Sequence, residues 1–474
     1  MTTTKKIAHN TIVQMIGKII ATLLGLLGVG LMTRYLGKEQ FGWYITTISF
    51  LQFLGILIDF GMIPVTAQML SEPRFDKKKL FQNLLTFRFV TAVLFLALAP
   101  LIALFFPYPR EVKIAISFTT IAFLGISMNQ VLIGLYQKKL HMHIQAIGEV
   151  LSRVVLVGGL YFLMQRGSSF LPIIGIISLA SVVYTAYLWI HARKLTDVTF
   201  AFDKTIWKAI ITKMWPIAIS IIFNVVYLKG DIILLSLYGS QTEVGLYGAA
   251  YRVIDILAQT AMLFMGIMLP LLAYAWSRDN AKEFRVRYQQ AFDTLTMLAV
   301  PMVIGTFILA EPIMLLVAGK EFAASADALR ILSLAVGGVY LGAIFGHVAV
   351  SINKQKQTMW IYISNAVLTL IGYLIFIPLY GMRGAAWMTV FSELYAGFLL
   401  WQIVSRYTKA PLQLQRLRKI LLSGAAMAGV ITLVPHWHVF LLVVIGATTY
   451  VLTLFALGGI SIKTIREVIS IKSA

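Results

Sequence analysis

The sequence predicts an all-α integral membrane protein with about fourteen transmembrane helices, and two observations lead to this prediction. Of its 474 residues, 59% are hydrophobic and 12% are charged, whereas soluble domains carry about 25% charged residues. Apolar runs of ~20 residues, the length that crosses a bilayer, recur along the whole chain. The composition argues against a soluble domain, and the runs give the helix count.

Polar breaks separate the predicted transmembrane segments. The first segment follows Lys5 and Lys6. It is too long for a signal-peptide core and has no A-x-A cleavage site, so we expect it to stay uncleaved. Later segments end at turn or charge signals such as Pro107-Tyr108-Pro109-Arg110. The expected segments are 10–34, 41–70, 80–106, 112–136, 143–165, 170–192, 212–238, 243–276, 289–318, 325–352, 358–378, 384–406, 418–436 and 438–460.

The distribution of basic residues agrees with this segment count. If the N-terminus is cytoplasmic, 27 of the 40 Lys and Arg residues fall in cytoplasmic segments, 7 in outer loops and 6 inside apolar segments. Basic residues concentrate in cytoplasmic loops of membrane proteins. We therefore expect both termini to be cytoplasmic, and topology explains most of the net charge of +21 without a nucleic-acid partner.

The longest internal polar stretch divides the chain. We expect an N-terminal six-helix bundle at 1–192, a cytoplasmic linker at 193–213 and a C-terminal six-helix bundle at 214–406. The remainder, 407–474, carries two additional helices and a tail. These two helices contain almost no charge and are expected to face lipid.

An internal repeat supports two related bundles. Gly37 to Tyr44 joins the first two segments, and Gly239 to Tyr247 joins the seventh and eighth. Each stretch reads as a glycine, a short polar run, an apolar residue and then Gly-x-Tyr. A repeat of six helices keeps its orientation, so an axis along the membrane normal would relate the bundles.

Six basic side chains interrupt apolar segments, and they are the most informative functional feature of the chain. A cation in hydrocarbon costs roughly 2.5–3.5 kcal/mol on insertion scales, so such residues line a wet cavity or hold a partner. A net basic set indicates an anionic cargo. The six residues are Lys18, Arg88, Arg153, Lys229, Arg252 and Arg330.

Helix geometry divides these cations. Arg153 lies about 15 Å past the cytoplasmic end of its helix and shares a face with Glu149, four residues earlier, so the two can pair. Arg252 and Asp255, three residues apart, offer the same two readings: a structural ion pair or a cavity cation for phosphate. Lys229 is freer to meet a ligand.

Depth separates three further basic residues. Lys18 and Arg88 lie about two turns into their segments, near enough to the cytoplasmic face for their side chains to extend to it. Arg330 is expected at an outer loop and is a weaker candidate. We therefore consider two alternatives for Lys18 and Arg88: their side chains line a ligand-binding cavity, or they extend to the membrane surface.

Five acidic residues accompany the cations. Asp231 lies ~200° around the helix from Lys229, so the two cannot pair and Asp231 needs another partner. Asp59 and Glu393 have no obvious local partner. We expect the set to balance buried cations or to carry a coupled proton or sodium ion. The five acids are Asp59, Glu149, Asp231, Asp255 and Glu393.

Several motifs, in order from residue 34 to residue 386, resemble those of polysaccharide and O-antigen flippases. These flippases belong to the multidrug/oligosaccharidyl-lipid/polysaccharide exporter superfamily. The matching motifs are Arg34-Tyr35-Leu36-Gly37 with Phe41-Gly42-Trp43-Tyr44, Asp59-Phe60-Gly61, Asp231 with Val244-Gly245-Leu246-Tyr247, Gly319-Lys320-Glu321-Phe322 with Leu329-Arg330-Ile331-Leu332, and Pro378-Leu379-Tyr380-Gly381 with Gly384-Ala385-Ala386.

The resemblance implies two six-helix bundles around a V-shaped central cavity. It also implies export of an undecaprenyl-diphosphate-linked oligosaccharide across the bacterial inner membrane by alternating access. The implied partners are this lipid-linked glycan, membrane lipids, a polysaccharide polymerase and glycosyltransferases. The expected substrate-binding cations are Arg153, Lys229, Arg252, Arg88, Lys18 and Arg34.

Other functions find less support in the sequence. A cation-coupled multidrug exporter of the same superfamily would favour an acidic or neutral cavity, whereas a peptidoglycan-precursor flippase would also need a basic one. A membrane enzyme would need a sizeable outer loop with catalytic residues, and the outer loops are short. The chain has no cysteine, no HExxH pattern and no phosphate-binding loop, so we expect no cofactor, metal or ATPase site.

Overall fold

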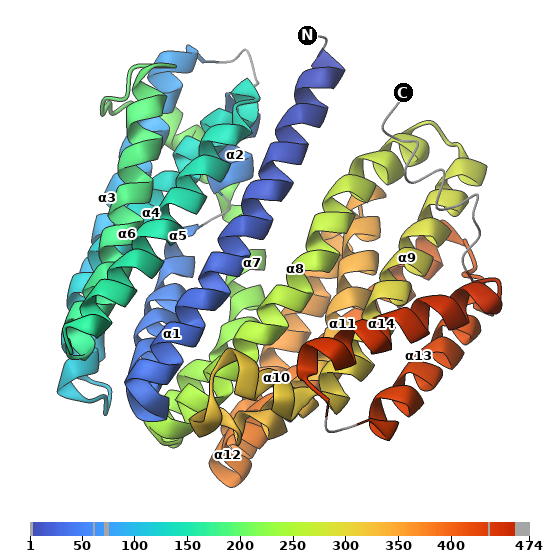
Figure 1. Cartoon of the computed structure of the whole chain (residues 1–474). Coiled ribbons are helices and arrows are strands. Elements are labelled where there is room, and N and C mark those ends of the chain that lie inside the picture. The colour runs from blue at the N-terminus through green and yellow to red at the C-terminus, as the bar shows by residue number, and fades with distance from the viewer. Residues whose placement is uncertain (1–2, 60–61, 71–74, 435–436, 460–474) are drawn as a thin grey trace. The chain divides into compact units, whose positions relative to one another are not determined.

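The computed structural model describes residues 3–59, 62–70, 75–434 and 437–459. Within these residues the chain forms fourteen α-helices and one short 3-10 helix, and no strand (Figure 1). The predicted all-α class is therefore confirmed. The helices are α1 (Thr3–Asp59), α2 (Met62–Met69), α3 (Lys77–Leu104), α4 (Arg110–Lys139), α5 (Met142–Gln165), α6 (Phe170–Arg193), α7 (Lys204–Tyr238), α8 (Gln241–Ser277), α9 (Ala281–Ile308), α10 (Ala310–Val317), η1 (Lys320–Phe322), α11 (Ser325–Ser351), α12 (Gln355–Thr408), α13 (Gln415–Leu433) and α14 (Val439–Ala456).

Two of these elements each contain two helices that meet at a glycine. In α1 the break is at Gly37, with φ of 67°, and in α12 it is at Gly381, with φ of 55°. Both angles lie in the left-handed region that glycine adopts without a Cβ penalty. The sequence predicted two segments in each of these stretches, separated at the same glycines.

Ten helices in the described part of the chain are long and apolar enough to cross a membrane. One of them, α12, has 54 residues and would extend for about 81 Å if it were straight. A hydrocarbon core of ~30 Å accounts for less than half of that length. The break at Gly381 therefore turns α12 into two crossings, and the protein is a multi-pass membrane protein.

Polar residues explain where the helices depart from the predicted segments. The segment expected at 289–318 is divided at Leu309 between α9 and α10, and α9 starts earlier, at Ala281. The Asn280 side chain caps this start by accepting a hydrogen bond from the Glu283 amide at 3.1 Å. Hydropathy detects the apolar core of a helix but not a capped polar first turn.

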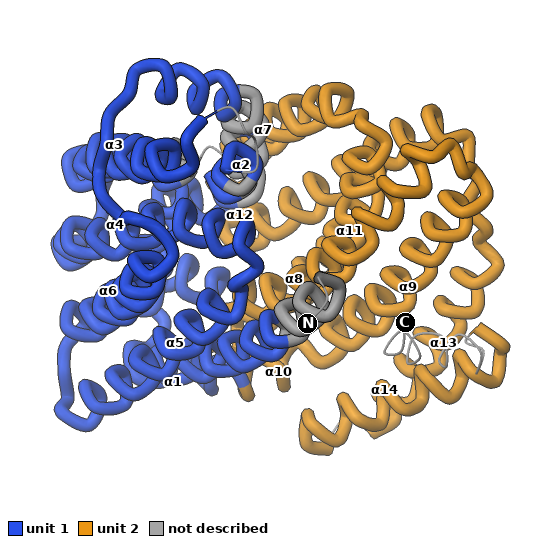
Figure 2. Tube along the Cα trace, turned by 90° about the horizontal axis from the view of Figure 1, so that it is seen from above, with its two compact units in different colours: residues 1–248, 317–321 blue, residues 249–316, 322–474 orange. Residues whose placement is uncertain are grey.

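Backbone contacts divide the chain into two compact units (Figure 2). Unit 1 comprises residues 1–248 and 317–321, and unit 2 comprises residues 249–316 and 322–474. The limits of the units follow from backbone contacts alone. They do not test the six-helix bundles expected at 1–192 and 214–406, which remain a prediction. In unit 1, α3 lies beside α4, and α4 lies beside α6 (Figure 1).

The core of unit 1 brings together side chains from α2, α3, α4, α6 and α7. Phe81, Leu84, Leu132 and Tyr136 are fully buried there, and the Tyr136 hydroxyl donates to the Leu188 carbonyl at 2.5 Å. Between membrane helices the hydrophobic effect is weak, so close packing and such polar contacts hold the helices together.

In unit 2, the two C-terminal helices pack on α9. Met427 and Ile431 of α13 and Leu442 and Tyr450 of α14 form a buried cluster against it. The Tyr450 hydroxyl donates to the Met297 carbonyl at 2.8 Å. The outer faces of both helices are apolar and exposed, as expected for helices that face lipid.

The linker between α6 and α7 is shorter than the predicted range 193–213, because α7 already begins at Lys204. Asp203 caps this helix, with Oδ1 accepting from the Thr205 amide at 2.9 Å and the Ile206 amide at 3.3 Å. The Lys79 ammonium of α3 donates to Asp203 Oδ2 at 2.6 Å. The linker is thereby attached to α3.

The Asp203 contacts predict a pH dependence. The hydrogen bond from Lys79, followed by those from the two amides, lowers the pKa of the Asp203 carboxyl below its ordinary value. A lowered pKa stabilises the folded state fully at pH values above the pKa of the unfolded chain, which is about 3.9 for Asp. This stabilisation is lost as the pH falls through the lower pKa of the folded state. We expect the melting temperature of the wild type to fall more steeply than that of Asp203→Asn below about pH 4. Parallel thermal scans in detergent would contradict this if the two curves kept a constant separation.

Candidate functional site

Three charged residues form a cluster on α1 and α5 of unit 1. The Lys18 ammonium lies 2.9 Å from Glu149 Oε1, with 39% and 22% of the two side chains exposed. Arg153 lies one turn further along α5, and it is the twelfth of the 24 residues of that helix. At 1.5 Å per residue it is ~17 Å from the start of the helix, close to its middle. We call Lys18, Glu149 and Arg153 the α1/α5 cluster.

Of the two readings of Arg153, an ion pair with Glu149 or a cavity cation, the structure does not contain the pair. Glu149 pairs with Lys18 of the neighbouring helix instead. Helix spacing allows an i,i+4 pair but does not exclude a competing cation from another element. In the described part of the chain, Arg153 has neither a hydrogen bond nor an ion pair, and its side chain is half-buried.

Small residues of α1 make room for this arrangement. A Cβ at Gly17 would lie 2.8 Å from the Ala146 Cβ, so α1 and α5 touch there. A Cβ at Gly25 would lie 3.9 Å from Nε and Cζ of Arg153. The guanidinium therefore lies over a glycine on the adjacent helix. Small residues let the backbones of neighbouring membrane helices approach closely, and these contacts are of that kind.

Arg88 differs from Arg153 in that it is fully inside unit 1. Its side chain is 1% exposed, its Nε donates to the Ser127 carbonyl at 3.1 Å, and its Nη2 donates to Gln130 Oε1. The expectation that Arg88 lines a cavity or extends to the membrane surface does not fit this conformation, in which it joins α3 to α4. Sequence spacing gave its depth in the membrane but not the direction of its side chain.

The position of Arg88 predicts a stability effect. Replacing a large buried side chain with alanine leaves a cavity and typically costs about 2–5 kcal/mol. We therefore expect Arg88→Ala to lower the melting temperature of the purified protein strongly, while Arg153→Ala leaves it nearly unchanged. Thermal unfolding of both variants in one detergent tests this contrast, and equal melting temperatures would contradict it.

The charged residues of α7 and α8 are held in two different ways. Asp231 is fully buried, and it accepts hydrogen bonds from the Tyr247 hydroxyl and the Ile232 amide, each at 2.7 Å. Arg252 Nη1 lies 3.7 Å from Asp255 Oδ2, which is the i,i+3 pair that the spacing allowed. Lys229 is half-buried on α7. Sequence reasoning did not select Tyr247 as a partner of Asp231, although the Gly-x-Tyr repeat marks its position.

Arg34 connects two of the sequence motifs. Its Nη1 donates to the carbonyls of Gly30 and Val317, each at 3.0 Å. A Cβ at Gly319 would lie 3.3 Å from Arg34 Cγ. Arg34 is exposed, and it holds the turn at residues 317–321 beside the break at Gly37. This contact is structural, and substrate binding by Arg34 remains a prediction.

Arg330 belongs to a surface ion cluster of unit 2. It lies 3.3 Å from Asp327 Oδ1 and 3.8 Å from Glu311 Oε2. Arg383 donates to the other carboxylate oxygen of Asp327 at 2.5 Å. Asp327 therefore links two motifs far apart in the sequence, which agrees with the weaker functional expectation for Arg330.

Glu393 is a buried acid in α12. It is 7% exposed, and within the described residues it has neither a hydrogen bond nor an ion pair. A Cβ at Gly338 of α11 would lie 2.7 Å from the Glu393 Cβ, so the two helices touch at this point. An ionised carboxylate in such a place is costly unless a cation accompanies it. The side chain of Asp59 lies outside the described residues.

The two repeated turns contact each other through their backbones. A Cβ at Gly42 would lie 1.8 Å from the Gln241 carbonyl oxygen, and a Cβ at Gly245 would lie 2.0 Å from the Lys38 carbonyl oxygen. Gly42 and Gly245 are 203 positions apart, and so are Lys38 and Gln241. Each turn therefore makes the same contact with the other, and the contact is reciprocal. Reciprocal contacts of this kind are the mark of a twofold relation. Only glycine fits at either position.

Comparison with known proteins gives a consistent picture. A family model described as "Polysaccharide biosynthesis protein" matches residues 7–276, and a second, MatE, matches residues 216–375. The "Probable low-salt glycan biosynthesis flippase Agl15" of Haloferax volcanii is 20% identical over 436 residues, which is 90% of this chain and 89% of that protein. The "Uncharacterized membrane protein MJ1068" of Methanocaldococcus jannaschii is 21% identical over 476 residues, 91% of this chain and 92% of that protein.

Solved structures share the fold at low sequence identity. A "Lipid II flippase MurJ, inward closed conformation" aligns with a TM-score of 0.79 at 17% identity, covering 93% of this chain and 98% of that one. An inward-facing "multidrug resistance MATE family transporter" aligns with a TM-score of 0.68 at 15% identity, covering 84% and 98%. At these identities the alignments establish the fold.

Proposed function

Because the chain belongs to the polysaccharide biosynthesis protein family of the multidrug/oligosaccharidyl-lipid/polysaccharide exporter superfamily, we propose that it flips a lipid-linked glycan. The cargo would be an undecaprenyl-diphosphate-linked oligosaccharide, the repeat unit of a polysaccharide. It would move from the cytoplasmic to the outer leaflet of the bacterial inner membrane. The observation that carries this proposal is Arg153, a guanidinium at mid-helix that forms no ion pair within the described residues.

The α1/α5 cluster has the charge and chemistry that a diphosphate requires. Its two cations and one acid leave a net positive charge between two helices that are long and apolar enough to cross the membrane. A guanidinium donates two parallel hydrogen bonds to phosphate oxygens, and Arg is less strongly hydrated than Lys, which lowers the cost of removing water. Arg153 would bind the diphosphate directly, and Lys18, which pairs with Glu149, would add charge beside it.

Other cations have secondary roles in this proposal. The half-buried Lys229 and Arg252 would contact the diphosphate or anionic sugars from the C-terminal bundle. Arg34 would contact the cargo at the outer turn. Arg88 is left out, because its side chain is buried between α3 and α4. The prenyl chain would remain in the bilayer while the polar part passes through a water-filled cavity.

Movement would follow alternating access, with the bundles expected at 1–192 and 214–406 rocking to open the cavity first inward and then outward. Glycosyltransferases on the cytoplasmic side would supply the cargo, and a polymerase on the outer side would consume it. Among the acids, Glu393 is best suited to carry a coupled proton or sodium ion, because it is buried without a partner in the described part of the chain.

Two alternatives remain within the same superfamily. The peptidoglycan precursor also carries a diphosphate on a prenyl lipid, so a flippase for it would use the same cluster. The MatE match supports a cation-coupled multidrug exporter. An exporter of cationic compounds would gain nothing from the positive charge of Arg153, because like charges repel.

A transport experiment distinguishes these functions. The full-length protein would be reconstituted into liposomes with a fluorescent prenyl-diphosphate oligosaccharide, the labelled peptidoglycan precursor or a cationic dye. The loss of fluorescence when a membrane-impermeant quencher is added outside the liposomes reports how much of each compound lies on the outer side. We expect transport of the oligosaccharide above the level in protein-free liposomes. Transport of the dye alone, or of the precursor alone, would overturn the proposed function in favour of that alternative.

A further inference from the structure

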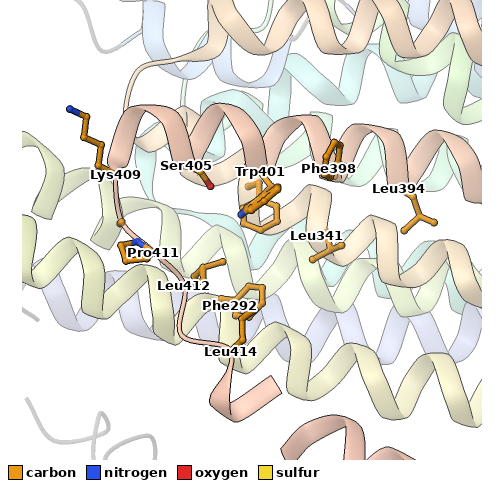
Figure 3. Close-up of a pocket in the computed structure, with 13 residues that line it drawn as sticks. Phe292, Leu341, Leu394, Phe398, Trp401, Ser405, Lys409, Pro411, Leu412 and Leu414 are labelled. Atoms are coloured by element: carbon orange, nitrogen blue, oxygen red, sulfur yellow. The ribbon is translucent and has the colours of Figure 1, made fainter. Parts of the chain in front are cut away.

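Unit 2 contains an apolar cavity of about 840 Å³ to which the proposed transport function assigns no role. Figure 3 shows it between α9, α11, α12 and the connection from α12 to α13. Its walls include Phe292, Leu341, Phe345, Phe398 and Trp401. Sites for small molecules measure about 300–1,000 Å³ and are mostly apolar, so both the size and the lining fit a ligand.

The connection that forms one wall is fixed in place. Gln289 of α9 accepts a hydrogen bond from the Gln413 amide at 2.9 Å and donates one to the Gln413 carbonyl at 3.0 Å. Arg416 donates to Asp293 of α9 at 2.9 Å. These contacts hold the connection against α9. The cavity is therefore a built feature of unit 2.

The rim of the cavity is basic. Lys409 ends α12 in the left-handed conformation, with φ of 49°, and Figure 3 shows its side chain at the rim, directed away from the apolar interior. The stretch from Arg406 to Lys419 contains five basic residues and no acidic one, and no acid lines the cavity. An apolar interior with a cation at its mouth matches a molecule with an anionic head and a hydrocarbon tail.

We propose that this cavity binds an anionic phospholipid of the cytoplasmic leaflet. An acyl chain would lie along Phe398 and Trp401, and the headgroup phosphate would contact Lys409. The distribution of basic residues assigns this end of α12 to the cytoplasmic side, where anionic headgroups attract basic residues by about 1 kcal/mol each. A large apolar cavity excludes water and accepts apolar guests. The site is separate from the α1/α5 cluster, which lies in unit 1.

The absence of cysteine permits a direct test. Leu414→Cys places a single thiol at the exposed rim of the cavity, where an environment-sensitive fluorophore can be attached to the full-length protein. Brominated phosphatidylglycerol or phosphatidylcholine is then titrated into the labelled protein in detergent. We expect saturable quenching by phosphatidylglycerol, with an apparent affinity at least fivefold higher than for phosphatidylcholine.

Two variants show whether the preference arises at this site. Lys409→Gln should remove the preference for phosphatidylglycerol, whereas Lys356→Gln, an exposed lysine at the other end of α12, should leave it unchanged. Native mass spectrometry of the unlabelled protein provides a second measurement: Ser405→Trp, which fills the mouth, should retain less phosphatidylglycerol than the wild type.

Three results would overturn the proposal. Equal quenching by the two lipids would mean that only surrounding lipid is sensed. An unchanged preference in Lys409→Gln would remove the assigned headgroup contact. Displacement of phosphatidylglycerol by a short prenyl diphosphate at equal concentration would assign the cavity to the transported lipid instead.

Discussion

Arg153→Ala is expected to reduce the rate of lipid-linked glycan transport by at least about tenfold. The hydrogen bonds of a charged group are worth about 1.5–3 kcal/mol, and 1.36 kcal/mol corresponds to a factor of ten. Arg153 is half-buried and has no hydrogen bond or ion pair in the described residues, so its removal should weaken cargo binding without unfolding the protein. Initial rates in proteoliposomes, with the amount of reconstituted protein matched, measure the effect.

Two further variants make the Arg153 result specific. Arg153→Lys keeps the charge but loses the planar pair of donors, so we expect a rate between those of the wild type and Arg153→Ala. Arg166 lies at the end of the same helix, exposed, with its guanidinium 4.2 Å above the Phe162 ring. Arg166→Ala should transport like the wild type. An equal loss in Arg153→Ala and Arg166→Ala would show a general effect of charge on α5.

Gly42→Ala is expected to have the second large effect on stability and transport, because the added methyl group would push the two repeated turns apart. The new Cβ would lie 1.8 Å from the Gln241 carbonyl oxygen, far inside any contact distance, and backbone must move to admit it. Overpacking of this kind costs typically about 1–3 kcal/mol. We expect a lower melting temperature and slower transport than in the wild type, because the backbones of the two turns can no longer meet.

Gly158→Ala provides the matched control for Gly42→Ala. Gly158 lies on α5, and a Cβ there meets nothing within 4 Å. It makes the same chemical change inside a membrane helix without a steric conflict, so its melting temperature and transport should remain near wild-type values. If Gly42→Ala behaved like Gly158→Ala in both measurements, the reciprocal contact between the turns would be irrelevant to stability and transport.

Much of the fold was predictable because membranes constrain sequence strongly. Apolar segments, basic loops and turn glycines indicated an all-α chain, and they located the breaks at Gly37 and Gly381. Hydropathy missed polar helical turns such as the start of α9, which depends on the cap at Asn280. Caps are local hydrogen bonds that no apolar run records.

The arrangement of the charged residues was predictable only in part. Sequence spacing identified the pair of Arg252 and Asp255 because both residues lie on one helix. It could not predict that Glu149 would pair with Lys18 rather than with Arg153, since this pairing depends on how α1 packs on α5. For the same reason it could not distinguish the buried Arg88 from the half-buried Arg153, and it left Tyr247 unassigned as the donor to Asp231.

The central claim is that positive charge in the middle of α5 recognises a diphosphate. Its most direct test is the transport, by one preparation of the wild-type protein, of two lipids with the same prenyl chain and the same oligosaccharide. One carries a diphosphate linkage and the other an uncharged linkage of similar length. The account predicts rapid leaflet exchange of the diphosphate lipid and little exchange of the uncharged one, and equal rates for the two lipids would contradict it.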